Sequence, residues 1–151
     1  MKLLKKTFEN MLAMLLGSLL FLLVLIIVMP NTYYSILNEY KINSYRSEEM
    51  VYSLAKMCNY SNGNIEKIQC VNNYFSMAFT YNNNKTGDVK PNDLFVQGGN
   101  CMDSSWFYCS VFEQMGLECD VVIASSINHS YNIVTVDDIY CILDQQLLWC
   151  V

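Results

Sequence analysis

The sequence has 151 residues, of which 53% are hydrophobic and 15% are charged, and its formal net charge is −5 at pH 7. This length suits one domain with a modest core, and no internal repeat indicates a second domain. Residues 31 to 151 hold thirteen Asp/Glu against six Lys/Arg, a net charge of −7 without a basic cluster, which argues against nucleic-acid binding.

An uncharged apolar segment, MLAMLLGSLLFLLVLIIVM, occupies residues 11–29. A helix of this length spans about 30 Å, the hydrocarbon thickness of a bilayer. A cleaved signal peptide is the alternative, but the run is longer than a usual signal-peptide core and no small-x-small cleavage pattern follows it. We therefore expect residues 1–30 to form a cytoplasmic stub and a single-pass transmembrane anchor.

The basic residues on the two flanks predict the orientation of this anchor. Lys2, Lys5 and Lys6 precede the apolar run, whereas the next basic residue after it is Lys41. Positive flanks stay in the cytoplasm, so the rest of the chain should lie outside the membrane, where cysteines can oxidise.

Helices are expected first along the outer part. Residues 31–46 form a juxtamembrane connector, for which a helix continuing from the membrane is one option, and residues 47–151 form the domain. Residues 47–58 have Ser47 in an N-cap position, acids in the first turn and apolar residues at helical spacing. Apolar residues from Ile65 to Phe79 repeat at intervals of three and four, which predicts a second helix ending near Thr80.

A polar loop follows at residues 81–93, and Asn92 or Asp93 is expected to cap a short helix at residues 94–97 that Gly98 and Gly99 end. The stretch GGNCMDSSWFYCSVFEQMG at residues 98–116 then predicts a buried helix, with Asn100 as the N-cap and Cys101 as its first residue.

After Gly116 the hydrophobic period changes to two. Residues 119–125, 129–136 and 139–144 read as three short strands joined by tight turns. Helices followed by strands predict an α+β domain in which a small antiparallel sheet packs against the Cys101 helix.

Seven cysteines lie in the outer part, at positions 58, 70, 101, 109, 119, 141 and 150. The odd count leaves at least one without an intrachain partner, and the sequence does not give the pairing; buried free thiols are the alternative. No CxxC pair occurs, so neither a zinc ribbon nor a thioredoxin-type redox site has the spacing that it needs. We expect no metal site and no cofactor.

Cys101 is placed for chemistry, because free backbone N–H groups and the positive end of the helix dipole favour a thiolate. His129 is the one histidine. A two-residue hairpin turn at Val136 and Asp137 places His129 directly opposite Asp144, and a turn at Asp137 and Asp138 shifts the pairing by two residues but keeps both side chains on one face. The carboxylate is then within reach of the imidazole.

These motifs resemble the transglutaminase-like superfamily of papain-like thiol enzymes. The match rests on GGNCMD, a helix ending in EQMG, the segment HSYNIVTV and the segment YCILD, and it covers roughly residues 65–144. The sequence has HSYN where the family usually has HAWN, and it ends seven residues after Asp144, so a partner chain is a candidate to complete the small sheet.

The resemblance implies Cys101 as the nucleophile, His129 as the general base and acid, and Asp144 as the residue that orients the imidazole. It also implies that the backbone N–H of Cys101 and the hydroxyl of Tyr81 bind the oxyanion.

The expected function is that of a membrane-anchored cysteine hydrolase acting on protein or peptide substrates through a thioester, as a peptidase or cell-envelope amidase. The alternatives are acyl transfer to an amine, a non-catalytic binding or scaffold module of the same fold, and an ectodomain in which Cys101 forms a disulfide with another cysteine.

Overall fold

The computed structural model describes residues 2–84 and 89–151 of the chain. These residues fall into two compact units, Met1–Glu39 and Tyr40–Val151. Residues 40–46, which the sequence pattern assigned to the connector, therefore belong to the second unit.

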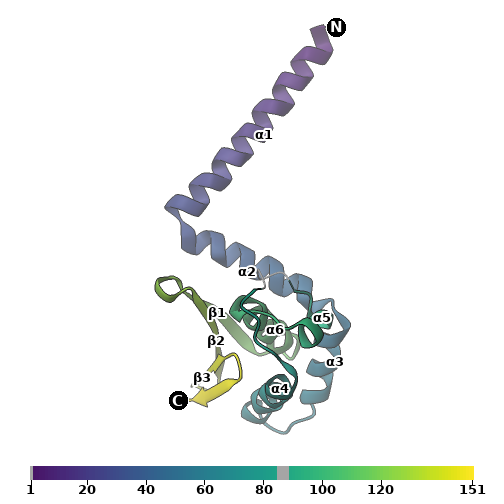
Figure 1. Ribbon diagram of the computed structural model, residues 1–151, viewed down its shortest axis with the longest axis vertical. Coiled ribbons are helices and arrows are strands. Elements are labelled where there is room, and N and C mark those ends of the chain that lie inside the picture. The colour runs from purple at the N-terminus through teal and green to yellow at the C-terminus, as the bar shows by residue number, and fades with distance from the viewer. Residues whose placement is uncertain (1, 85–88) are drawn as a thin grey trace. The chain divides into compact units, whose positions relative to one another are not determined.

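The first unit is helical. Helix α1 spans Lys2–Val28 and helix α2 spans Pro30–Arg46, of which residues 30–39 lie in this unit (Figure 1). The helices are separate because a residue that precedes proline avoids the helical conformation, and Met29 precedes Pro30. Among the described residues, one helical segment, Lys6–Val28, is long and apolar enough to cross a membrane. A signal sequence near the N-terminus can meet the same criterion of length and hydropathy.

The second unit begins with the end of α2 and continues with four helices. They are α3 (Glu49–Cys58), α4 (Asn64–Ala78), α5 (Pro91–Gln97) and α6 (Cys101–Gln114). The predicted helices are confirmed, with two corrections at their starts.

Ser47 does not cap α3, because its hydroxyl donates to the carbonyl of Ser44. Asn92 does not cap α5, because it lies inside that helix. Its side chain instead accepts a bond from the Met50 backbone N–H at 3.2 Å and donates to Glu48 at 2.9 Å, so it caps the start of α3 from a distant part of the chain.

The strands form one antiparallel sheet in the order β1-β2-β3-β4. Strand β1 spans Glu118–Ala124, β2 spans His129–Val136, β3 spans Ile139–Asp144 and β4 spans Leu147–Cys150. The first three match the predicted strands, and β4 is an addition that the sequence pattern did not predict. The α+β class is thus confirmed.

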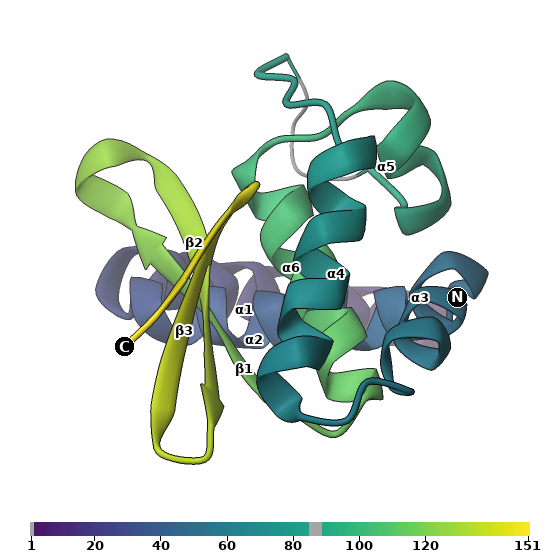
Figure 2. The same cartoon turned by 90° about the horizontal axis from the view of Figure 1, so that it is seen from below.

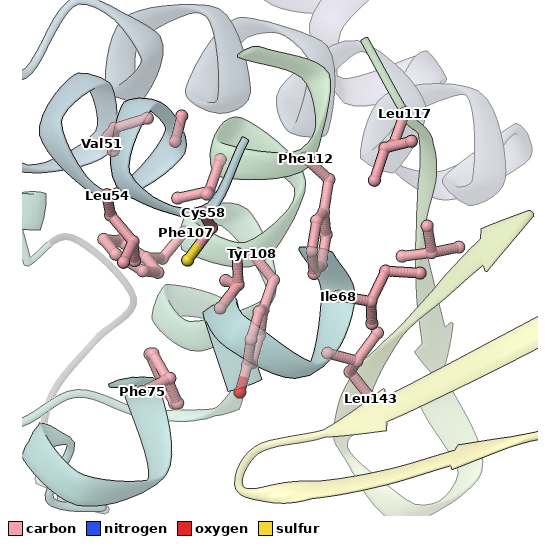
Figure 3. Packing of buried hydrophobic residues seen from close by; sticks show 14 of the residues in the cluster. Val51, Leu54, Cys58, Ile68, Phe75, Phe107, Tyr108, Phe112, Leu117 and Leu143 are labelled. Atoms are coloured by element: carbon pink, nitrogen blue, oxygen red, sulfur yellow. The ribbon is translucent and has the colours of Figure 1, made fainter. Parts of the chain in front are cut away.

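Helix α6 lies at the centre of the unit, between the sheet and the other helices (Figure 2). One of its sides packs on β1 and β2, and another contacts α3 and α4. The core between these layers contains fully buried aromatic and aliphatic side chains, among them Phe75, Phe107, Tyr108, Phe112 and Leu143 (Figure 3).

All seven cysteines lie in the described part of the chain, and six of them form disulfides. Cys58 pairs with Cys70, Cys109 with Cys119, and Cys141 with Cys150. These bonds join α3 to α4, α6 to β1, and β3 to β4, so they staple the main contacts of the fold. Cys101 is the free thiol, which overturns the alternative that it forms a disulfide.

Candidate active site

The start of α6 is fixed by a capping box around Cys101. The Asn100 side chain accepts from the backbone N–H groups of Met102 and Asp103, and the Asp103 carboxylate accepts in return from the Asn100 N–H at 2.9 Å. The other Asp103 oxygen accepts from the Val89 N–H at 3.0 Å, which ties the preceding loop to the helix. Cys101 is the first helical residue and is 8% exposed.

The backbone before Cys101 is packed too closely for a side chain at Gly99. A Cβ atom there would lie 2.5 Å from Leu94 Cδ1 and 2.9 Å from the Cβ of Asp103. Gly99 also pairs with Tyr81 in a parallel bridge: its N–H donates to the Thr80 carbonyl, and its own carbonyl accepts from Asn82 at 2.9 Å. This bridge holds Tyr81 beside the residues that lead into Cys101.

Tyr81 contacts the Cys101 thiol. The pKa of Tyr81 is raised above its ordinary value, chiefly by partial burial. Three smaller effects raise it further: the negative charge of an ionised Cys101, a hydrogen bond with the Cys101 side chain, and the charge of Asp144. The phenol therefore keeps its proton and remains a hydrogen-bond donor beside the thiol. Because 41% of the Tyr81 side chain is exposed, a ligand can reach it.

The hairpin between β2 and β3 brings His129 and Asp144 together. Its two-residue turn consists of Asp137 and Asp138, which both have a positive φ, and Val136 pairs with Ile139. Of the two predicted registers, the structure therefore has the one that is shifted by two residues. In this register His129 is not directly opposite Asp144. His129 Nε2 lies 2.8 Å from Asp144 Oδ1. A carboxylate only accepts, so Nε2 carries the hydrogen and Nδ1 is left as the acceptor of a neutral ring.

Strand β2 is attached to α6 by polar side chains that no sequence pattern had indicated. Ser105, one turn after Cys101, bonds Ser130 at 3.2 Å, and the buried Asn132 amide donates to the Ser105 carbonyl at 2.9 Å. Ser130 and Asn132 thus point to α6. Because side chains alternate along a strand, His129 and Asp144 lie on the opposite face of the sheet. They lie at the end of β2 whose polar side chains are bonded to the first turns of α6.

The structure therefore joins the sequence-predicted residues in two pairs, His129 with Asp144 and Tyr81 with Cys101. The charge of Asp144 contributes to the raised pKa of Tyr81. Within residues 2–84 and 89–151, no group of three or more His, Cys, Asp or Glu side chains is arranged to hold a metal ion.

Comparisons with protein-family models, with curated proteins and with solved structures find no match for this chain.

Proposed function

We propose that the chain is a membrane-anchored cysteine hydrolase with a minimal transglutaminase-like core, acting on amide or peptide bonds through Cys101, His129 and Asp144. The observation that carries the proposal is the position of Tyr81. Its hydroxyl makes a hydrogen bond with the Cys101 side chain, and the charge of Asp144, the carboxylate that holds His129, raises its pKa. A phenol, a free thiol and a carboxylate-bound imidazole are the donor, nucleophile and base that acyl transfer requires.

In the acylation step, His129 Nδ1 takes the thiol proton, and the Cys101 sulfur attacks the carbonyl carbon of the substrate. Asp144 holds the ring by its other nitrogen and stabilises the imidazolium. The carbonyl oxygen becomes an oxyanion, which accepts hydrogen bonds from the Cys101 N–H and the Tyr81 hydroxyl. When the C–N bond breaks, the imidazolium gives its proton to the departing amine, and a thioester remains on Cys101.

In the deacylation step, a water molecule loses a proton to His129 and attacks the thioester carbon. The C–S bond breaks, the carboxylic acid leaves, and the proton returns to the Cys101 sulfur. Water at about 55 M needs no binding site of its own, so hydrolysis is preferred to transfer onto an amine.

The proposed location follows from the helix and the disulfides. Lys6–Val28 would span the bilayer with the N-terminus in the cytoplasm, as the lysine flank predicts. The three disulfides support an extracytoplasmic domain, because such bonds persist in oxidising compartments.

A stoichiometric burst tests the proposal. The full-length protein in detergent is mixed with an N-acyl amino acid p-nitrophenyl ester, and nitrophenol release and intact mass are followed together. We expect a burst of about one nitrophenol per chain and an acyl adduct on Cys101. Cys101→Ala should remove both, and His129→Gln should slow the burst severely. An adduct that forms on Cys101 at the same rate in folded His129→Gln protein would overturn the mechanism.

A further inference from the structure

The C-terminal part of the chain is strongly asymmetric in charge. Between Pro91 and Val151 there is no lysine or arginine. The same stretch has eight acidic residues: Asp93, Asp103, Glu113, Glu118, Asp120, Asp137, Asp138 and Asp144. The six basic residues of the second unit all precede Pro91. The sheet therefore belongs to the acidic half of this unit.

The two faces of the sheet differ in their environment. The face that includes Asn132, Val134, Cys141 and Leu143 is buried against the helices. The opposite face, which we call the outer face, carries His129 and Asp144 at one end. The proposed catalytic pair thus belongs to the outer face.

Apolar side chains and acids follow one another across the outer face. Trp149 on β4 pairs with Ile142 on β3, which pairs with Ile133 on β2, which pairs with Asp120 on β1. Leu147 and Tyr140 flank this row and are 64% and 54% exposed, and Trp149 is 45% exposed. The row runs from an apolar end at β4 to an acidic end at β1, where Glu118 and Asp120 are both exposed.

We propose that the outer face binds the substrate, and that the preferred substrate is a peptide segment with an apolar side chain and, a few residues along, a lysine or arginine. The apolar side chain packs on Trp149 and Ile142, and the cation lies near Asp120 and Glu118. The inference rests on the proposed function, because the face is continuous with His129 and Asp144. It adds the chemistry of the substrate.

Charge complementarity favours this occupant. Glu118, Asp120, Asp137 and Asp138 repel the anionic headgroups of a membrane surface and would face like charges in a second copy. A basic peptide is attracted by the acids at the β1 end of the row, Glu118 and Asp120.

Binding can be measured without turnover in the full-length Cys101→Ala protein, held in nanodiscs of neutral phosphatidylcholine. Trp149 is the reporter, because the other tryptophan, Trp106, is only 3% exposed. Three peptides of equal length serve as probes: one with leucine and lysine, one with the lysine replaced by glutamine, and one with the leucine replaced by serine. We expect the first to shift the Trp149 emission and bind most tightly, and its affinity to fall as salt increases.

A matched pair of variants tests the acidic end of the row. Asp120→Asn should weaken the lysine peptide by about two- to fivefold and leave the glutamine peptide unchanged. Asp93→Asn makes the same change at an exposed residue of α5 and should alter neither affinity.

Equal affinity for all three peptides would overturn the inference. The inference would also be overturned if acrylamide failed to quench Trp149 fluorescence before peptide is added, because the bilayer or a second copy would then cover the outer face. The nitrophenyl ester burst does not depend on these peptides. Charge-selective peptide binding without a burst would contradict the proposed hydrolase function and support the outer face as a binding site. A burst without selective binding would support the hydrolase function and contradict the proposed binding site.

Discussion

Tyr81 is better suited to donate a hydrogen bond than to ionise. Its pKa is raised by partial burial and by the negative charges of Cys101 and Asp144, so the phenol keeps its proton beyond the ordinary range of a tyrosine. A neutral donor next to a thiolate is what an oxyanion needs when the negative charge moves from sulfur to oxygen.

Tyr81→Phe should therefore lower kcat by about 10²-fold, the usual effect of removing one oxyanion donor, with little change in KM. Steady-state kinetics with the nitrophenyl ester measure this. Tyr60→Phe, at a tyrosine that is 79% exposed, is the matched control and should keep the wild-type kcat. An unchanged kcat in folded Tyr81→Phe protein would assign Tyr81 a purely structural role.

Residues with local signals were predicted best. Asn100 was predicted as the N-cap of the Cys101 helix and acts as one, and the structure adds the return bond from Asp103 that completes a capping box. Asp144 was placed beside His129 because any even-length turn keeps them on one face. The contact of Tyr81 with Cys101 has no local signal, because it depends on a bridge between segments eighteen residues apart.

At the scale of elements, the close packing around Gly99 positions the start of α6. Gly99→Ala should cost about 1–3 kcal/mol of unfolding free energy, because the new methyl group lies too close to both Leu94 and the Cβ of Asp103, and both must shift. Urea unfolding of the second unit measures the loss. Gly17→Ala, where no heavy atom lies within 4 Å, should leave the unfolding curve unchanged. Equal stability of both variants would contradict the packing argument.

Tyr108 joins α6 to α4 and to the turn after β3, with its hydroxyl 2.9 Å from Asn72 Oδ1 and 2.7 Å from the Gln145 carbonyl. Burial raises its pKa far above the ordinary value of 10.0. The unfolded chain therefore releases this proton near pH 10 while the folded chain retains it, so stability is complete below pH 10 and is lost as the pH rises further.

Tyr108→Phe should be less stable than the wild type at pH 8 by about 1 kcal/mol, because the polar contacts are lost. Its stability should then fall less steeply between about pH 10 and 11. Urea unfolding in a Cys101→Ala background, which avoids thiol exchange with the disulfides, gives both slopes. Equal slopes would show that Tyr108 ionises as easily in the folded state as in the unfolded state.

The elements that the sequence did not predict share a physical cause. Strand β4 has the sequence LLWC, which lacks the alternation of a half-buried strand because its outward side chains are also apolar. Its turn, at Gln145 and Gln146, lacks glycine or asparagine although Gln145 has a positive φ. The cap of α3 by Asn92 and the attachment of β2 by Asn132 are tertiary contacts, which local patterns do not record.

For the whole molecule, the proposed topology puts the N-terminal lysines in the cytoplasm and the second unit outside the cell membrane that Lys6–Val28 would span. A membrane-impermeant amine reagent added to intact cells should modify Lys56, which is exposed on α3, and should spare Lys2, Lys5 and Lys6. Permeabilised cells are the control, in which all four should react. Modification of the N-terminal lysines in intact cells, with Lys56 protected, would reverse the orientation and return the disulfides to a reducing compartment.

In the proposed mechanism Cys101, His129 and Asp144 act as one unit, and the rate of iodoacetamide alkylation at Cys101 as a function of pH measures whether they do. Asp144→Asn removes a negative charge, which by itself would make the thiolate easier to form. We expect the opposite shift, to higher pH, because a less stable imidazolium supports the thiolate less well. Asp138→Asn, the same change in the exposed hairpin turn, should leave the profile unmoved. With folding verified by circular dichroism, an unchanged profile or a shift to lower pH in Asp144→Asn would contradict the triad.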